Sequence, residues 1–118
     1  MRSLRILLAE DDDLIGELLG EMLVDMGHIV CSIEVTERGT VEAALRLLPD
    51  LMIVDVGLNP GSGIDAVDAI TQVRPVPHVL VSGNYAELTR LKPGSIRLEK
   101  PYRPAALERA MQSAMHNG

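Results

Sequence analysis

The sequence of 118 residues lacks most of the features that mark membrane, secreted and disulfide-rich proteins. It has one cysteine, Cys31, which cannot form a disulfide within the chain, and its apolar neighbours favour a buried thiol over a catalytic one. No apolar run approaches the roughly 18 residues of a membrane span, and the first residues lack the apolar stretch of a signal peptide. These absences predict a protein without a membrane partner, located in the reducing cytoplasm.

An excess of positive charge is also absent. The chain carries 11 Lys and Arg against 17 Asp and Glu, a net charge of -6, and this balance argues against direct nucleic-acid binding, which depends on basic patches. Hydrophobic residues make up 47% and charged residues 24%, values typical of a folded globular protein. The length fits one domain, so residues 1–118 are expected to form a single unit without linker or repeat.

Short apolar runs alternate with amphipathic segments along the chain. Strands are predicted at residues 4–9, 29–35, 51–56, 78–82 and 95–98. Helices are predicted at 14–26, 41–48, 64–73 and 107–114, with a weaker, shorter one at 85–91. This alternation predicts a mostly parallel sheet covered by helices on both faces, with the almost wholly apolar third strand at its centre and the fifth strand, which contains Arg97, at an edge.

The residues that end the predicted strands are polar and chemically distinctive. Glu10 and Asp11 follow the first strand, Asp55 ends the third, Ser82 ends the fourth, and Lys100 follows the fifth. In open α/β sheets, ligands bind where the carboxyl ends of the strands meet at a topological switch point. A doubly wound strand order would therefore bring these five residues to one pocket.

Carboxylates that converge at one edge repel one another unless they share a cation. Ligand sets made only of oxygen favour Mg²⁺ over zinc. We predict Asp11 and Asp55 as direct ligands and Glu10 as a ligand through water, while the Gly57 carbonyl could add a main-chain oxygen. With Lys100 nearby, phosphoryl transfer fits this set, because that chemistry needs positioning and charge neutralisation; Asp55 would be the nucleophile that forms an aspartyl phosphate.

Other polar residues have simpler interpretations. Asp12 and Asp13 are expected to cap the first helix and to complement its dipole. The three histidines are scattered along the chain and are interpreted as structural or exposed: His28, His78 and His116. The segment Gly61-Ser62-Gly63 lacks the following glycine of a dinucleotide fingerprint, and the chain has no Gly-Lys-Ser/Thr phosphate loop, so no nucleotide cofactor is predicted.

Four segments together resemble a known family, the receiver domains of two-component response regulators. They are Arg5-Ile-Leu-Leu-Ala-Glu-Asp-Asp, Asp50-Leu-Met-Ile-Val-Asp-Val-Gly-Leu, Val79-Leu-Val-Ser-Gly and Leu98-Glu-Lys-Pro-Tyr. Their order and spacing match the family across essentially all 118 residues. The resemblance implies a doubly wound, flavodoxin-like domain with five parallel strands in the order 2-1-3-4-5. The Lys-Pro peptide bond of the fourth segment is often cis in the family.

The resemblance also implies a role for each matched residue. Asp55 would accept phosphate from a histidine kinase or a histidine phosphotransfer protein, and Ser82 and Lys100 would contact the phosphoryl oxygens. The N–H groups of Gly57 and Gly83 would complete the phosphate site. Mg²⁺ would be held by Glu10, Asp11, Asp55 and the Gly57 carbonyl. Phosphorylation would shift the surface of the last two helices and thereby control a downstream protein partner, or the phosphate itself would be passed on.

The chain departs from the family's usual pattern at several positions. Arg97 stands where the family usually has an aromatic residue in strand five, and neither Tyr85 nor Tyr102 occupies that position. In the loop after Asp55, Asn59-Pro60 displaces the usual proline by one residue. Gly57 and Asn84 stand at positions that influence how long the phosphate persists in the family. Four residues near the last two helices are expected to form the face displayed to partners: Arg90, Arg97, Tyr102 and Arg103.

Two further functions compete with a stand-alone phosphoacceptor that is not itself an enzyme. The first is a small Mg²⁺-dependent phosphatase with Asp55 as nucleophile, against which Gly57 counts, because such enzymes place a second acid two residues after the nucleophile. The second is a degenerate receiver that binds partners independently of phosphate. The intact set of Glu10, Asp11, Asp55, Ser82 and Lys100 argues against that second function.

Overall fold

Strands and helices alternate along the whole described chain, as the apolar periodicity predicts. The computed structural model describes residues 2–89 and 91–117, and within them five strands and five helices occur. The order is β1 (Arg5–Ala9), α1 (Asp13–Asp25), β2 (Ile29–Glu34), α2 (Glu37–Leu47), β3 (Leu51–Asp55), α3 (Gly63–Val73), β4 (His78–Ser82), α4 (Tyr85–Leu88), β5 (Arg97–Glu99) and α5 (Pro104–Asn117).

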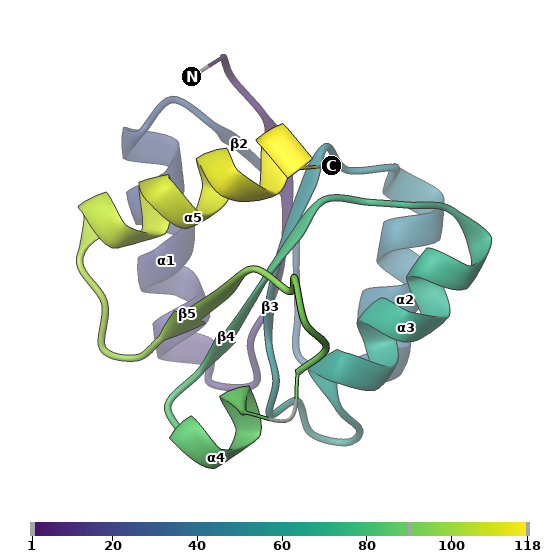
Figure 1. Ribbon diagram of the computed structural model, residues 1–118. Coiled ribbons are helices and arrows are strands. Elements are labelled where there is room, and N and C mark those ends of the chain that lie inside the picture. Colours follow the sequence, from purple (N-terminus) through teal and green to yellow (C-terminus); the bar gives the residue numbers. More distant parts are fainter. Residues whose placement is uncertain (1, 90, 118) are drawn as a thin grey trace.

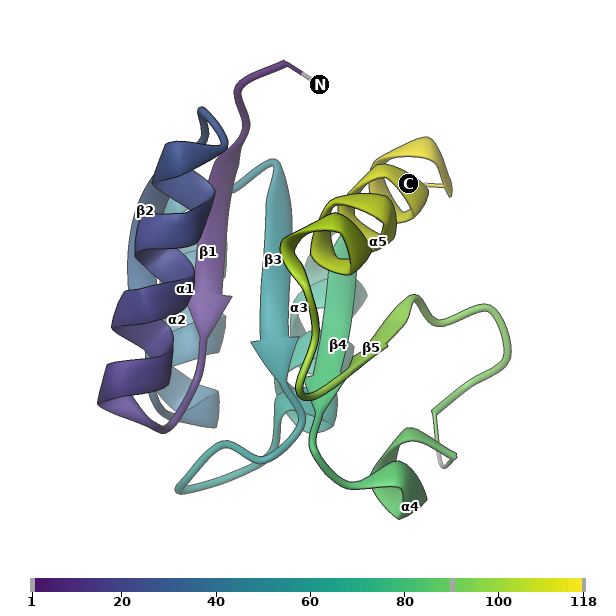
Figure 2. The same cartoon turned by 90° about the vertical axis from the view of Figure 1, so that its left-hand side faces the viewer.

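The strands form one parallel sheet in the order β2-β1-β3-β4-β5, which confirms the predicted flavodoxin-like fold. Helices α1 and α5 cover one face of the sheet, and α2 and α3 cover the other (Figures 1 and 2). Short α4 follows β4 near the end of the sheet where the strands finish (Figure 2). No helix within the described ranges combines the length and apolarity that crossing a membrane would require.

Strand β3 lies at the centre of the sheet and contributes to the core on both faces. Leu51 and Ile53 pack into the cluster under α1 and α5, while Met52 and Val54 pack into the cluster under α2 and α3. All four side chains are at most 1% exposed. A strand buried on both faces is expected to be apolar throughout, and the polar Asp55 marks the point where β3 leaves the core.

Several boundaries differ from those predicted, and capping side chains account for two of them. Asp12 accepts a hydrogen bond from the Ile15 N–H over 3.0 Å, so α1 begins at Asp13 and the predicted capping role is confirmed. Thr36 accepts from the Gly39 N–H over 2.9 Å, so α2 begins well before its first apolar residue. At the other end of the chain, β5 covers 97–99 instead of 95–98, and α4 ends at residue 88.

The lone thiol and the histidines have structural surroundings. Cys31 is half-buried instead of fully buried; its Sγ donates to the Ile6 carbonyl over 3.3 Å, and burial raises the pKa of the thiol. His28 is 7% exposed, and its Nδ1 accepts from the Leu4 N–H over 3.1 Å. His78 contacts the Val76 carbonyl and His116 is exposed, so the three histidines are structural or exposed, as predicted.

Candidate functional site

The polar residues at the strand ends gather at one end of the sheet. Glu10 follows β1, Asp55 ends β3, Ser82 ends β4 and Lys100 follows β5. The strands are parallel, so their carboxyl ends share one edge, and β1 and β3 are direct neighbours there (Figure 2). This arrangement brings together residues from four separate parts of the sequence.

Lys100 connects two of the carboxylates. Its Nζ lies 2.6 Å from Glu10 Oε1 and also donates to Asp55 Oδ2. Burial by itself would lower the pKa of the ammonium group, but the hydrogen bonds to Asp55 and Glu10 outweigh burial and raise the pKa of Lys100 to about 12. Lys100 is therefore a fixed positive charge between the two acids across the physiological pH range.

Glu10 is the most deeply placed of the acids, with 4% of its surface exposed. Desolvation raises the pKa of its carboxyl, although the hydrogen bond from Lys100 and one from the Asp12 N–H, over 3.2 Å, act in the opposite direction. The short segment after β1 therefore has two local functions. It begins α1 through Asp12, and it directs Glu10 inward toward Lys100.

Asp11 completes an acidic cluster. Carboxylate oxygens of Glu10, Asp11 and Asp55 lie within 4.8 Å of one another, and Asp11 is the exposed member. Three carboxylates with one ammonium group leave two negative charges uncompensated within this set of four residues. A donor set made only of oxygen with this excess charge fits a divalent cation of the Mg²⁺ type.

The loop after β3 fixes the orientation of Asp55. Asp55 Oδ1 accepts a hydrogen bond from the Gly57 N–H over 2.8 Å, so one carboxylate oxygen faces the loop and the other faces Lys100. A Cβ at position 63 would lie 2.0 Å from the Asp55 carbonyl oxygen. Only glycine therefore allows the start of α3 to pass this close to the acidic residue.

In the sequence, Gly63 and its neighbour Ser62 resemble only an incomplete nucleotide-binding motif. Ser62 in fact caps α3, accepting from the Ile64 and Asp65 N–H groups, while the Gly63 N–H donates to the Val56 carbonyl over 2.8 Å. The sequence signal that could have identified this arrangement is a serine followed by glycine at a helix start, shortly after a strand that ends in an acid.

Ser82 is 1% exposed at the end of β4, and its hydroxyl is engaged on the α4 side. Its Oγ lies 2.7 Å from Glu87 Oε1 and 3.2 Å from the Asn84 carbonyl, and it accepts from the Asn84 N–H over 2.9 Å. Gly83, the next residue, is exposed; a Cβ there would come within 3.8 Å of Lys100 Cβ. Glu87 is a member of this site that the sequence did not indicate.

The residues expected on the displayed face lie around β5 and the start of α5. Arg97 is exposed, and its Nη1 donates to the Leu88 carbonyl over 3.0 Å. Tyr102 is half-buried against the α1 and α5 side of the core, and burial raises the pKa of its hydroxyl. Arg103 is exposed, whereas Arg90 and the side chain of Tyr85 lie outside the described residues.

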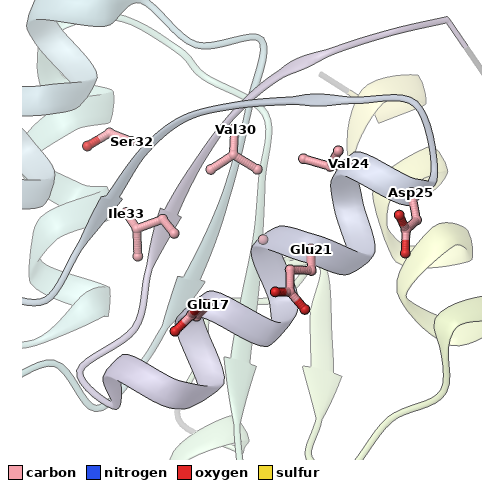
Figure 3. Close-up of a pocket in the computed structure, with 8 residues that line it drawn as sticks. Glu17, Glu21, Val24, Asp25, Val30, Ser32 and Ile33 are labelled. Carbon is pink, nitrogen blue, oxygen red and sulfur yellow. The ribbon is translucent and has the colours of Figure 1, made fainter.

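A cavity of about 540 Å³ lies elsewhere, between α1 and β2 (Figure 3). Its lining includes the carboxylates of Glu17, Glu21 and Asp25 and the apolar side chains of Val24 and Val30. None of the residues of the acidic cluster lines it. This cavity and the acidic cluster therefore lie in different parts of the fold. We assign the candidate site to the cluster, where Lys100 contacts two of the three carboxylates.

Comparisons with known proteins identify chains that are similar to this one in sequence and fold. No protein-family model matches the chain. The transcriptional regulatory protein KdpE of Escherichia coli is 35% identical over 86 residues, 73% of this chain and 38% of that protein. The chemotaxis protein CheY of Thermotoga maritima is 23% identical over 112 residues, 91% of this chain and 93% of CheY.

A solved structure extends the similarity across the fold. The receiver (REC) domain of the Erythrobacter litoralis response regulator PhyR superposes with a TM-score of 0.85 and 27% identity, covering 97% of this chain and 91% of that domain. The aligned part of the chain spans only 38% of KdpE, so the similarity to that regulator concerns one part of it. Strand order, acidic cluster and matched relatives agree, and the chain belongs to the response regulator receiver domains of two-component signalling.

Proposed function

We propose that residues 1–118 act as one receiver unit in which Asp55 accepts a phosphoryl group. The observation that carries this proposal is the contact of Lys100 with both Asp55 and Glu10, with Asp11 in the same cluster. An acid at the end of a buried strand, held by a fixed positive charge, is a nucleophile whose position is set before the donor arrives. Both carboxylate oxygens of Asp55 accept hydrogen bonds, so the attack needs no general base to remove a proton from the nucleophile.

The proposed donor is a phosphohistidine of a histidine kinase or a histidine phosphotransfer protein. A carboxylate oxygen of Asp55 forms the new bond to phosphorus as the bond from phosphorus to the histidine nitrogen breaks, and that nitrogen keeps the electron pair. Lys100 balances charge on the phosphoryl oxygens. Ser82 contributes its hydroxyl, and the N–H groups of Gly57 and Gly83 are the proposed main-chain donors.

Mg²⁺ is the proposed cofactor. Glu10, Asp11, Asp55 and the Gly57 carbonyl would hold it, and their oxygen donors and uncompensated charge fit such an ion. When bound, Mg²⁺ supplies positive charge that neutralises the phosphoryl oxygens during transfer. Asp11 is the member best placed to recruit the ion from solution, because it is the exposed acid of the cluster.

The proposed output is a change of surface around α4, β5 and α5, read by a downstream protein partner. A phosphoryl group adds about 1.5 to 2 negative charges at Asp55. Lys100 contacts Asp55 and precedes the segment that leads into α5, whereas Ser82, which contacts Glu87 on α4, would contact the added phosphoryl group. Arg97, Tyr102 and Arg103 are the described residues that this surface offers to a partner. We expect the protein to act in the cytoplasm, where its kinase donor would be found.

Intact mass measured after incubation with acetyl phosphate and Mg²⁺ tests the phosphoacceptor. We expect one added phosphoryl group in the unmodified chain and in Asp65→Asn, which removes an exposed acid on α3. We expect none in Asp55→Asn or after chelation of the metal. An adduct that persists in Asp55→Asn would contradict the proposal. Failure with both acetyl phosphate and a kinase donor would contradict it too and would support a receiver that binds partners independently of phosphate.

A further inference from the structure

The hydroxyl of Ser82 is held by a carboxylate that lies outside the acidic cluster. Ser82 Oγ lies 2.7 Å from Glu87 Oε1, a short contact between a hydroxyl donor and a half-buried carboxylate acceptor. The Asn84 carbonyl is farther away, at 3.2 Å. A hydroxyl has a single proton, and hydrogen bonds to ionised acceptors are the stronger ones, so Glu87 is the principal partner of Ser82.

Glu87 is held in place by the short helix that carries it. Asn84 Oδ1 accepts from the Ala86 N–H over 2.9 Å, and the Glu87 N–H donates to the Asn84 carbonyl over 3.0 Å. Leu88, the next residue, is 4% exposed and packs into the core under α2 and α3. The hydrogen bond from Ser82 to Glu87 therefore joins the end of β4 to a helix that is itself anchored.

We infer that Glu87 is a positioning residue that competes with the phosphorylated Asp55 for the Ser82 hydroxyl. The inference rests on the proposed function, in which Ser82 donates to a phosphoryl oxygen. That donation requires the hydroxyl to leave Glu87, so the hydrogen bond opposes phosphorylation by the free energy needed to break it. Release of Glu87 then frees one side of α4, which couples the chemistry at Asp55 to the proposed output surface.

The competition can be measured with beryllofluoride, which occupies the place of a phosphoryl group on a carboxylate. In the presence of Mg²⁺, we expect Glu87→Ala to lower the dissociation constant for beryllofluoride by about tenfold, the size expected for loss of a hydrogen bond to a charged group. Glu87→Gln keeps an uncharged oxygen acceptor, so a smaller decrease is expected. The chain contains no tryptophan whose fluorescence could report binding, so the readout is fluorine NMR of the bound beryllofluoride.

A double variant separates this role from a merely structural one. If Glu87 acts through the hydroxyl, Glu87→Ala will have no effect on beryllofluoride affinity once Ser82→Ala is present. The matched control is Glu21→Ala, which removes an exposed acid from α1 and should leave the affinity unchanged. An unchanged affinity in Glu87→Ala would overturn the inference, as would an equal effect in the presence and absence of the Ser82 hydroxyl.

Failure of the inference is distinguishable from failure of the proposed function. If the unmodified chain binds no beryllofluoride, both the phosphoacceptor role and the competition are overturned. If it binds beryllofluoride and the Glu87 variants do not differ from it, only the inference is overturned. A second readout uses the unphosphorylated protein: hydrogen exchange at the Glu87 and Leu88 amides should accelerate in Ser82→Ala and in Glu87→Ala, with no further acceleration in the double variant. Additive acceleration would contradict the inference.

Discussion

Arg97 on β5 donates a hydrogen bond from Nη1 to the carbonyl oxygen of Leu88 at the end of α4, over 3.0 Å. The last carbonyl groups of a helix have no partner within the helix; this one accepts from the Leu91 N–H over 3.3 Å and from the guanidinium on the neighbouring strand. Arg97 stands where the family usually has an aromatic residue in strand five, and in this chain its side chain binds a backbone carbonyl of α4.

Replacing Arg97 should therefore loosen α4. In Arg97→Ala we expect faster hydrogen exchange at the α4 amides, with a loss of stability of about 1 kcal/mol or less, because Arg97 is exposed. Arg103→Ala removes an exposed arginine just before α5 and serves as the control. Equal exchange rates in the two variants would show that the hydrogen bond to Leu88 does not restrain the helix.

Gly63 should tolerate no side chain. Gly63→Ala would place a Cβ 2.0 Å from the Asp55 carbonyl oxygen, so the backbone of either β3 or α3 must move. We expect the free energy of unfolding, measured in urea, to fall by about 1 to 3 kcal/mol, the range for overpacked positions. Gly57→Ala is the matched comparison, because its Cβ would meet Asp55 Oδ1 at an ordinary 3.6 Å. Similar losses in both variants would contradict the steric argument.

Mg²⁺ should stabilise the folded chain through Asp11. At a Mg²⁺ concentration ten times its dissociation constant, binding adds about 1.4 kcal/mol to the free energy of unfolding. Thermal unfolding with and without Mg²⁺ should show this gain in the unmodified chain and in Asp13→Asn, an exposed acid of α1 outside the cluster, but not in Asp11→Asn. A gain that survives in Asp11→Asn would place the metal elsewhere.

His28 should make the fold sensitive to mild acid. Burial lowers the pKa of His28 below its ordinary value, and its Nδ1 must stay unprotonated to accept from the Leu4 N–H. As the pH falls below the ordinary pKa of histidine, about 6.5, His28 binds a proton in the unfolded chain but stays unprotonated in the folded chain. Stability attributable to His28 is therefore full above this pH and decreases below it, by at most about 1.4 kcal/mol per pH unit.

The variant His28→Asn tests this assignment, because asparagine offers an oxygen acceptor and does not titrate. Urea unfolding measured between pH 7.5 and pH 5.5 should show a smaller loss of stability in His28→Asn than in the unmodified chain. The same dependence in both proteins would assign the acid sensitivity to other groups.

The sheet could be predicted because its strands are distinguished by composition. The wholly apolar segment at 51–54 indicated a strand buried on both faces, and it is the central strand. The strand predicted at 95–98 begins two residues before β5 begins and ends one residue before β5 ends, because only Leu98 of the three β5 residues is buried and the pattern is correspondingly weak. The start of α2 was missed because a capping hydroxyl at Thr36, and not an apolar residue, begins the helix.

The candidate site was predictable where chemistry lies directly at a strand end. Glu10, Asp55 and Lys100 could be selected by position, and the structure brings them into contact. Glu87 could not be selected, because its connection to Ser82 depends on how a short, weakly patterned helix packs against the sheet. The need for glycine at position 63 could not be predicted either, because it arises from the nearby backbone carbonyl of Asp55 in β3.

The two-sided burial of β3 has a consequence for how a new charge at Asp55 is accommodated. Leu51 and Ile53 are fixed against one layer of helices, and Met52 and Val54 against the other. Interiors packed at this density resist displacement, so the strand cannot slide or tilt to relieve repulsion at its end. Electrostatic repulsion at Asp55 must instead be relieved by the segments beyond the strand ends, which lack the two-sided packing of β3.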